Sequence, residues 1–330
     1  MAKREPSGED KLIERFFKPL ASHPGALALS DDAAFLTPPA GHDLVLTADM
    51  TVAGVHFFPD DPPETIGKKA LRVNLSDLAA KGAEPVGALM TISLPGRTDE
   101  FWIEQFARGL GEDCAAFGCP LLGGDTTKTP GPLTISITAI GKVPTGAMVR
   151  RAGAKPGDLI TISGTIGDGA LGLFASRNDP SLSGLSGEQR DELIRRYRVP
   201  EPRLALAPLL REYATAAMDV SDGLVGDLAK LAANSDVAAS VEVSKLPLSN
   251  PAHDAIEAMP ALLERVLTGG DDYEVLAAIP DARFPAFAEA AGRVGVPVTA
   301  IGRFSSGEGI RVIGLRGEEL SFAKSAYSHF

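Results

Sequence analysis

Residues 215–233, TAAMDVSDGLVGDLAKLAA, contain an apolar strand that runs directly into a helix. The strand TAAMDV includes Asp219 near its end, and Ser221 and Asp222 follow in the short turn before the helix begins at Gly223. Two carboxylates and a hydroxyl are therefore expected at a helix N-terminus, where free main-chain N–H groups attract phosphate. The same side chains could only cap the helix, and capping is compatible with binding a metal-bound phosphate.

The alternation of strands and helices extends outward from this segment over most of the chain. We expect strands at 43–48, 85–94, 133–143, 158–163 and 215–219, and helices at 9–20, 63–83, 98–117, 168–176, 187–212 and 223–234. This pattern predicts an α/β or α+β fold. The Pro- and Ser-rich segment 177–188 is expected to be a surface loop.

The length of 330 residues exceeds the usual size of one domain. The stretch RRAGAKPGD, residues 150–158, is rich in Gly, Pro and charge, and it leads into a new strand. We therefore expect an N-terminal domain at 1–149 and a C-terminal α/β domain at 150–330.

The composition limits the partners of the protein. A formal net charge of -11 with 6% aromatic residues argues against a nucleic-acid surface. No run of about 18 apolar residues occurs, which excludes a membrane span and a signal peptide. Cys114 and Cys119 fit neither a zinc site nor a disulfide framework. These features predict a cytoplasmic protein that binds neither nucleic acid nor membranes.

Familiar nucleotide and hydrolase motifs are absent from the sequence. No Walker A motif occurs, and GTIGDG at 164–169 lacks the spacing of a dinucleotide fingerprint. We interpret GTIGDG as an ordinary turn from strand to helix. The five histidines are scattered, and no hydrolase triad or zinc motif is present.

The chemistry of the chain is carried by aspartates at strand ends and in Gly-rich turns. They are Asp31, Asp32, Asp49, Asp77, Asp125, Asp219, Asp222, Asp271 and Asp272. Each alone could be an N-cap or turn residue. Hard cations such as Mg²⁺, however, are bound by carboxylate oxygens contributed by several segments. An acidic protein that handles phosphate needs such cations between its carboxylates and the substrate oxygens, so the set predicts a divalent metal site.

Asp77 lies on the apolar face of the helix expected at 63–83. The same face carries Ile66, Ala70, Val73 and Ala80. An unpaired charge directed at a core is costly, so Asp77 needs a partner. Lys81, four residues further on, could supply one. We favour a metal ion shared with other aspartates.

The ordered motifs resemble those of the thiamine-monophosphate kinases, a family within the aminoimidazole ribonucleotide synthetase superfamily. The motifs are SDDAA, TVAGVHF, KALRVNLSDLAAKGA, GGDTT, RRAGAKPGD, MDVSDGL and GGDDYE, between GEDKLIERF near the start and YSHF at the end. The resemblance implies a two-domain subunit whose N-terminal domain binds ATP and metal. It also implies a homodimer in which two N-terminal mixed sheets form a barrel, with active sites in clefts between domains and at the dimer interface.

The resemblance also implies roles for individual residues. The implied Mg²⁺ ligands are Asp32, Thr47, Ala48, Asp49, Asp77, Asp125, Asp219 and Asp222, and those expected to be catalytic are Asp77, Asp125, Asp219 and Asp222. The implied ATP contacts are Gly124 and Asp125 of the GGD turn, Arg151 and Ser221. The implied contacts to thiamine monophosphate are His56 and Asp271. His56 could instead be a half-buried turn residue, and Arg151 could pair with an acidic neighbour.

Three positions depart from the family pattern. Ser30 stands where glycine is usual before the double aspartate, and Asp271 stands where glutamate is common. Ala48 replaces a hydroxyl residue, so only its main-chain carbonyl can serve as a ligand. The aromatic residue that the family places against the substrate could be Phe322 or Tyr327.

The activity implied by the resemblance is direct, in-line transfer of the γ-phosphoryl group from Mg-ATP to thiamine monophosphate, giving thiamine diphosphate and ADP. One alternative is another ATP-using superfamily member, such as a selenophosphate synthetase or aminoimidazole ribonucleotide synthetase. The chain lacks the reactive cysteine with a nearby lysine that selenophosphate synthetases share. Another alternative is a non-catalytic dimer with structural metal, but such a protein has no use for Arg151 and Ser221.

Overall fold

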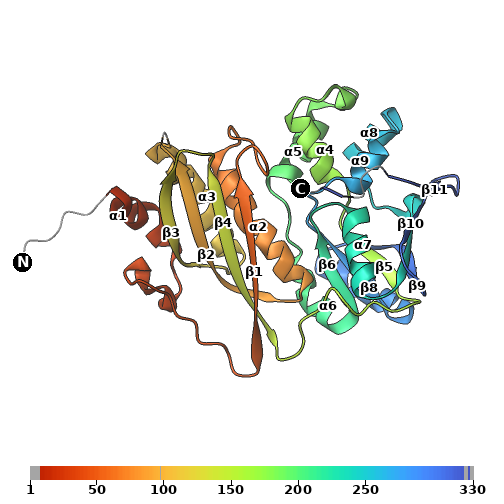
Figure 1. The fold of residues 1–330 in the computed structure, drawn as a ribbon, viewed down its shortest axis with the longest axis horizontal. Coiled ribbons are helices and arrows are strands. Elements are labelled where there is room, and N and C mark those ends of the chain that lie inside the picture. Colours follow the sequence, from red (N-terminus) through yellow and green to blue (C-terminus); the bar gives the residue numbers. More distant parts are fainter. Residues whose placement is uncertain (1–7, 97, 323–325, 328–330) are drawn as a thin grey trace, which may run out of the picture. The chain divides into compact units, whose positions relative to one another are not determined.

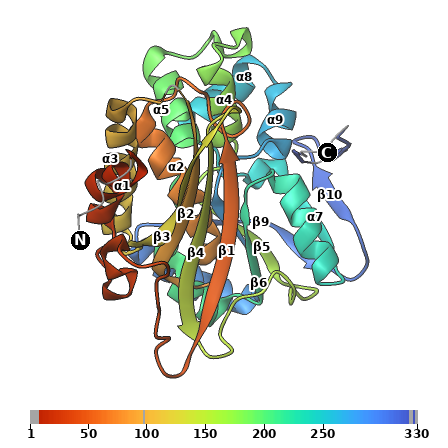
Figure 2. The same cartoon turned by 60° about the vertical axis from the view of Figure 1, so that its left-hand side comes forward.

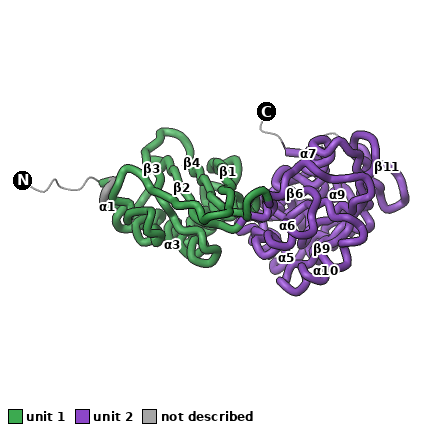
Figure 3. Tube along the Cα trace, turned by 90° about the horizontal axis from the view of Figure 1, so that it is seen from below, with its two compact units in different colours: residues 1–78, 84–146 green, residues 79–83, 147–330 purple. Residues whose placement is uncertain are grey.

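The computed structural model of the protein describes residues 8–96, 98–322 and 326–327. The chain forms two compact units (Figure 3): unit 1 contains residues 1–78 and 84–146, and unit 2 contains residues 79–83 and 147–330. One junction between the units lies at 146–147, and residues 79–83, which fall within the N-terminal domain expected at 1–149, belong to unit 2.

Unit 1 contains a four-stranded mixed sheet with the strand order β1-β4-β2-β3. The strands are β1 (His42–Val52), β2 (Glu84–Pro95), β3 (Leu121–Thr129) and β4 (Thr134–Pro144). Strands β2 and β3 are parallel, and the other neighbours are antiparallel. Helices α2 (Pro63–Ala80) and α3 (Glu100–Ala116) lie on one side of this sheet (Figures 1 and 2).

The two faces of the sheet differ because side chains alternate along each strand. In β4, Ile135, Ile137 and Ala139 are buried, whereas Ser136 and Thr138 point to the opposite face. On that opposite face of β1, Leu46 is 63% exposed and Met50 is 57% exposed. The sheet thus has a covered face toward the helices and a partly open face.

The N-terminal segment partly differs from the single helix expected at 9–20. It contains α1 (Gly8–Leu12), a π-helical turn (Ile13–Phe17) and a 3₁₀ turn (Lys18–Leu20). Pro19 lacks an N–H group and is tolerated only in the first turn of a helix, so the α-helix cannot continue through it. A further 3₁₀ segment, Pro24–Leu29, follows, and its Ala26 belongs to a small apolar cluster with Leu122 and Ile140.

The expectation of a turn at GGDTT was wrong, because Gly123–Thr127 lie inside β3. Glycine has a low β propensity, so the sequence did not indicate a strand there. A Cβ at Gly124 would lie 1.7 Å from the carbonyl oxygen of Met90 on β2. Close approach of the two strands therefore requires glycine at this position.

Unit 2 contains a seven-stranded sheet with the order β11-β10-β7-β9-β5-β8-β6. The strands are β5 (Leu159–Ser163), β6 (Ala216–Val220), β7 (Ala238–Glu242), β8 (Glu274–Ile279), β9 (Val298–Ser305), β10 (Ile310–Ile313) and β11 (Glu319–Leu320). The helices are α4 (Asp168–Ser176), α5 (Gly187–Arg198), α6 (Ala207–Tyr213), α7 (Leu224–Asn234), α8 (Asn250–Ala258), α9 (Leu262–Thr268) and α10 (Phe284–Arg293).

The central strands of unit 2 are buried on both faces. Leu276 of β8 belongs to one apolar cluster, which includes residues of α4, α7 and α9, whereas its neighbour Val275 belongs to a second cluster with residues of α6 and α10. This is why β6 and β8 appear as continuous apolar runs without alternation.

The segment 177–188 is not only a surface loop, as was expected. It contains the 3₁₀ turn Pro180–Leu182, and Leu182 and Leu185 are buried in the core. Helices were expected near 187–212, and the structure has two there, α5 and α6, with an interruption between them. Pro200 and Pro202 lie in this interruption, where their rings and missing N–H groups prevent a continuous helix.

Among the described residues, no helix combines the length and apolar character needed to span a bilayer.

Candidate functional site

Strand β1 and helix α2 position the first group of candidate ligands in unit 1. Thr47 Oγ1 donates a hydrogen bond to Asp77 Oδ2 at 2.5 Å. The main-chain N–H of Asp49 donates to Asn74 Oδ1 at 3.0 Å. Alternation along β1 places Thr47 and Asp49 on one face and Ala48 on the other. A half-buried carboxylate, a hydroxyl and a second, exposed carboxylate thus lie along this part of unit 1.

The partner of Asp77 differs from the ion pair considered above. The ammonium group of Lys81 donates at 2.7 Å to the carbonyl oxygen of Ala217. Asp77 instead accepts a hydrogen bond from the neutral hydroxyl of Thr47. A neutral donor leaves the negative charge of Asp77 in place, and this charge suits a cation.

A second group of candidate ligands lines a pocket of about 740 Å³ on the open face of the sheet of unit 1. Asp31, Asp32, Gly124 and Asp125 contribute to the pocket, and all four are exposed. Apolar side chains, including those of Phe17, Leu36 and Leu89, form much of the remaining wall. Carboxylate oxygens beside an apolar wall are suited to a ligand that combines a ring with cation-bound phosphates.

The turn before the double aspartate is closed by Ser30, one of the departures from the family pattern. Ser30 Oγ donates at 2.6 Å to the carbonyl oxygen of Leu27. The main-chain N–H of Asp32 donates at 2.8 Å to Asp31 Oδ1. The hydroxyl of Ser30 therefore adds a bond within the turn that glycine could not make.

His56 lies half-buried in the turn that follows β1. Its Nδ1 accepts from the main-chain N–H of Val52 at 3.1 Å, and its carbonyl oxygen accepts from Lys69 Nζ at 2.9 Å. Because Nδ1 is an acceptor, the ring proton of neutral His56 lies on Nε2. The turn fixes both the main chain and the ring of this residue.

In unit 2, the turn after β6 holds the candidate residues of the VSDGL motif. Asp219 is buried within β6, while Ser221 and Asp222 are half-buried beyond its end. The carboxylate of Asp222 accepts through Oδ2 from Lys230 Nζ at 2.5 Å. The main-chain N–H of Tyr327 donates at 3.0 Å to the carbonyl oxygen of Asp222.

The position of Tyr327 bears on the choice between two C-terminal aromatic residues. Tyr327 is 51% exposed and is joined through its main chain to Asp222. Phe322 instead packs against the apolar core of unit 2. Tyr327, and not Phe322, therefore lies at the VSDGL turn.

Arg151 lies exposed in the segment before β5. Within the described part of the chain, no ion pair joins its guanidinium to an acidic side chain. Its carbonyl oxygen lies 3.5 Å from Ser235 Oγ.

The GGDDYE segment is held against the VSDGL turn by its main chain. The N–H of Asp271 donates to the carbonyl oxygen of Ser221 at 2.9 Å, and the N–H of Tyr273 donates to that of Val220 at 2.8 Å. Asp271 and Tyr273 both have positive φ, at 71° and 53°. Such backbone is uncommon for residues with a Cβ and persists where the surrounding structure fixes it.

Asp272 points in the opposite direction and is fully enclosed. Its two oxygens accept from the main-chain N–H groups of Gly167 and Gly169 at 2.8 and 2.9 Å. This confirms the interpretation of GTIGDG as a strand-to-helix turn, since its own chain supplies the anion at α4. Burial raises the pKa of Asp272 well above its ordinary value.

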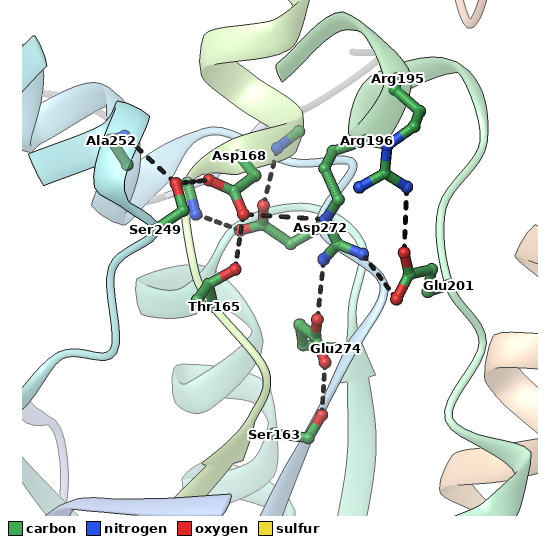
Figure 4. A network of polar contacts seen from close by, with 12 residues as sticks. Ser163, Thr165, Asp168, Arg195, Arg196, Glu201, Ser249, Ala252, Asp272 and Glu274 are labelled. Atoms are coloured by element: carbon green, nitrogen blue, oxygen red, sulfur yellow. Dashed lines mark hydrogen bonds and ion pairs between the residues drawn. The ribbon is translucent and has the colours of Figure 1, made fainter. Parts of the chain in front are cut away.

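A buried network of charges lies beneath the same segment (Figure 4). Glu274 accepts from Arg196 Nη2 at 2.7 Å, from Arg203 Nε at 2.7 Å and from Ser163 Oγ at 2.6 Å. Asp168 accepts from Thr165 Oγ1 and Ser249 Oγ, each at 2.5 Å. Sequence reasoning missed this network, because its members come from segments far apart in the chain.

Two further residues that sequence reasoning missed belong to the segment quoted at the outset. Asp227 is fully buried, and its Oδ2 accepts from the main-chain N–H groups of Ser221 and Asp222. Burial raises its pKa, and the Lys230 ammonium opposes that rise. The sequence did contain a signal for this contact, because Asp227 and Lys230 lie three positions apart, shortly after the SDG turn, and so share one face of the helix.

The structure brings together only some of the predicted ligands. Thr47 contacts Asp77, and Asp32 and Asp125 share a pocket, whereas Asp219 and Asp222 belong to unit 2. Among the described residues, His253, Asp254 and Glu257 are the group of three potential ligands within 4.8 Å of one another; all are exposed, and none was predicted. The predicted ligands are thus divided between the units.

Comparisons with known proteins place the chain in a family. The AIR synthase related protein family matches with its N-terminal domain at residues 30–143 and its C-terminal domain at residues 155–314. The thiamine-monophosphate kinase of Caulobacter vibrioides is 43% identical over 331 residues, which cover 98% of this chain and 91% of that protein.

Solved structures give the same result. The thiamine-monophosphate kinase from Stenotrophomonas maltophilia K279a superposes with a TM-score of 0.77 at 40% identity, covering 88% of this chain and 91% of that one. A complex of AaThiL with AMPPCP and TMP superposes with a TM-score of 0.78 at 33% identity, covering 91% of each chain. The chain therefore belongs to the AIR synthase related family and, within it, to the thiamine-monophosphate kinases.

Proposed function

We propose that this protein transfers the γ-phosphoryl group of ATP to the phosphate of thiamine monophosphate, releasing thiamine diphosphate and ADP. The observation that carries the proposal is the pocket of unit 1, where Asp31, Asp32 and Asp125 face an otherwise largely apolar cavity beside Gly124. The related AaThiL has been solved in complex with AMPPCP and TMP, which supports both substrates.

The donor atoms fit Mg²⁺ as a resident cation. The predicted ligands offer carboxylate, hydroxyl and carbonyl oxygens, which Mg²⁺ prefers, and no sulfur or imidazole nitrogen. We propose as ligands Asp32, Thr47, Ala48 through its carbonyl, Asp49, Asp77, Asp125, Asp219 and Asp222. When bound, Mg²⁺ supplies the positive charge that offsets repulsion between the two phosphates.

The residues that contact the substrates can be given roles from their surroundings. Gly124 and Asp125 at the pocket wall, Arg151 and Ser221 are proposed to contact ATP. The exposed guanidinium of Arg151 presents planar donors that match phosphate oxygens.

His56 and Asp271 are proposed to bind thiamine monophosphate. With Nδ1 of His56 engaged as an acceptor, its Nε2 is a hydrogen-bond donor and not a general base. No base is needed, because a phosphate monoester has a second pKa of about 6 and is largely dianionic near neutral pH. The residues therefore have to bind and align two phosphates in line.

We further propose that the protein is a cytoplasmic homodimer in which the open faces of two unit 1 sheets form a barrel. Leu46, Met50 and Leu89 expose apolar surface on this face. Two buried, free cysteines suit a reducing compartment. Leu46→Glu is expected to shift the protein to monomers in analytical ultracentrifugation, whereas Leu315→Glu in unit 2, at another exposed leucine, is expected to leave the dimer intact.

The function is tested by ADP production from purified protein with Mg-ATP, with products identified by mass. Thiamine monophosphate is compared with free thiamine and with substrates of the aminoimidazole pathway. We expect thiamine diphosphate from the monophosphate alone, and none after chelation of the metal. ATP binding without product from the monophosphate would refute the proposed substrate.

A further inference from the structure

Asp227, on α7, contacts the VSDGL turn from inside the protein. The residue is fully buried, and its Oδ2 accepts from the main-chain N–H of Ser221 at 3.0 Å and of Asp222 at 2.9 Å. The N–H of Asp227 donates at 2.9 Å to the carbonyl oxygen of Gly223. One side chain therefore fixes the main chain of two residues proposed to bind ligands, without itself facing outward.

Lys230, one helical turn further along α7, links this buried carboxylate to the half-exposed one. Its Nζ lies 2.8 Å from Asp227 Oδ1 and 2.5 Å from Asp222 Oδ2. A single ammonium group is thus shared by two carboxylates, one of which, Asp222, is a proposed Mg²⁺ ligand. A divalent cation that binds Asp222 is therefore repelled by the ammonium group of Lys230.

The carbonyl groups of the same turn are engaged from the other side. The oxygens of Ser221 and Asp222 accept from the N–H groups of Asp271 and Tyr327. Gly270 approaches so closely that a Cβ there would lie 2.2 Å from the Ser221 oxygen. Contacts within the protein therefore hold this turn from both sides, as is needed for a group that has to be preorganised for a ligand.

We propose that Asp227 and Lys230 are a positioning pair, in which Asp227 holds the Ser221–Gly223 turn in its ligand-binding conformation and Lys230 occupies the place of a cation at Asp222. The inference rests on the proposed function for the identity of the ligands. It assigns to Lys230 the task of weakening the affinity of Asp222 for divalent cations, so that metal and nucleotide bind there together and not the metal alone.

The first test uses Asp227→Asn in the full-length protein. An amide keeps the size but replaces one acceptor by a donor. We expect the KM for ATP to rise about ten-fold, as for loss of a residue that orients a ligand-binding group, with little change in kcat. Asp158→Asn is the matched control, because Asp158 is also buried in unit 2 and accepts from the main-chain N–H of Lys155 and from Thr215 Oγ1.

Both variants are expected to lower the melting temperature, so stability alone does not decide the matter. The positioning role predicts that only Asp227→Asn changes the KM. If the two variants lose stability alike and both keep the wild-type KM, Asp227 has a purely structural role and the inference fails.

The second test measures cation binding without activity. Mn²⁺ binding to the nucleotide-free protein is followed by electron paramagnetic resonance in wild type, Lys230→Met and Asp222→Asn. Methionine keeps the apolar stem of lysine but removes the charge. We expect Lys230→Met to bind Mn²⁺ about ten-fold more tightly at a site that Asp222→Asn abolishes. Unchanged, weaker or undetectable binding in Lys230→Met overturns the role of Lys230.

The two tests separate this inference from the proposed function. Suppose that the wild type produces thiamine diphosphate, that Asp227→Asn keeps the wild-type KM for ATP, and that Lys230→Met keeps the wild-type affinity for Mn²⁺. The proposed function then stands, and the positioning pair is refuted. If Lys230→Met binds Mn²⁺ more tightly but the wild type does not phosphorylate thiamine monophosphate, the positioning pair stands and the proposed function fails.

Discussion

The candidate residues of unit 1 and unit 2 are held in different ways. In unit 1, Asp31, Asp32 and Asp125 are exposed, and the partner of Asp77 is a neutral hydroxyl. In unit 2, Asp222 is paired with a lysine, Asp272 is bound by two amides, and Glu274 is paired with two arginines. The candidate carboxylates of unit 1 therefore keep charge available for a ligand, whereas Asp272 and Glu274 of unit 2 stabilise the protein around the VSDGL turn.

Because of this difference, substitution of a candidate carboxylate in unit 1 should mainly reduce activity, whereas substitution of a paired carboxylate in unit 2 should mainly reduce stability. Removing a carboxylate that has no charged partner leaves no unpaired charge in the folded state, so stability should change little. Removing one partner of a buried ion pair leaves an uncompensated charge. The four predictions below test this distinction, beginning with the largest effect.

Asp77→Asn is expected to lower turnover of thiamine monophosphate with Mg-ATP about 1000-fold, the upper range for loss of one charge-stabilising group. The melting temperature in chelator should change little, because the partner of Asp77 among the described residues is the neutral hydroxyl of Thr47. Steady-state kinetics and a thermal melt measure the two effects. Asp60→Asn, at an exposed position of unit 1, is the control, and wild-type turnover in Asp77→Asn would refute the metal assignment.

Glu274→Gln is expected to lower the free energy of unfolding by about 3 kcal/mol, because Arg196 and Arg203 lose the fully buried carboxylate between them and keep only Asp168 and Glu201 as counter-charges. Urea unfolding followed by circular dichroism measures the change. Glu289→Gln removes an exposed ion pair with Arg293 on α10 and should have little effect. Equal stability of the two variants contradicts the distinction drawn between the units.

Thr47→Val is expected to raise the Mg²⁺ concentration at half-maximal turnover about ten-fold, because the change removes a proposed hydroxyl ligand together with the donor that orients the Asp77 carboxylate. Titration of Mg²⁺ at saturating ATP measures the change. Thr51→Val alters a threonine two positions beyond Asp49 on the same face of β1, whose hydroxyl bonds to the carbonyl of Ile135. If Thr51→Val has the same effect, the hydrogen bond to Asp77 is not the cause.

The smallest effect is expected when the folded protein is treated with a thiol reagent, because Cys114 and Cys119 are buried and should not react. Burial raises the pKa of each thiol to about 12. The unfolded chain releases these protons above about pH 8.5, whereas the folded chain keeps them. Stability should therefore decline as pH rises from about 8.5 toward 12. Absorbance with an aromatic disulfide reagent, before and after adding urea, detects the thiols, and rapid reaction of the folded protein contradicts their burial.

The sequence was sufficient to predict the strand–helix alternation and the two-domain organisation. It was misleading at GGDTT, where glycines normally indicate a turn. The strand is stabilised there by contact with β2, whose paired residues are 34 positions earlier in the chain (Met90 opposite Gly124), so the contact leaves no local signal. Tertiary contact overrides local propensity at such positions.

The candidate site was predictable in its aspartates but not in their orientation. Asp271 and Asp272 are adjacent, yet one is half-exposed and the other is buried against α4. Regular alternation cannot assign their directions, because Asp271 and Tyr273 have positive φ. Asp227 and Glu274 were missed for a related reason, since a carboxylate is expected at the surface unless its partners are known.

The VSDGL turn receives hydrogen bonds from residues at very different distances along the chain. Asp227 is five or six residues from its partners, Asp271 is 50 residues from Ser221, and Tyr327 is 105 residues from Asp222. Closing a longer loop costs more conformational entropy. During folding, the contact with Asp227 is therefore expected to form early, and those with Asp271 and Tyr327 only after the segments between them have been ordered.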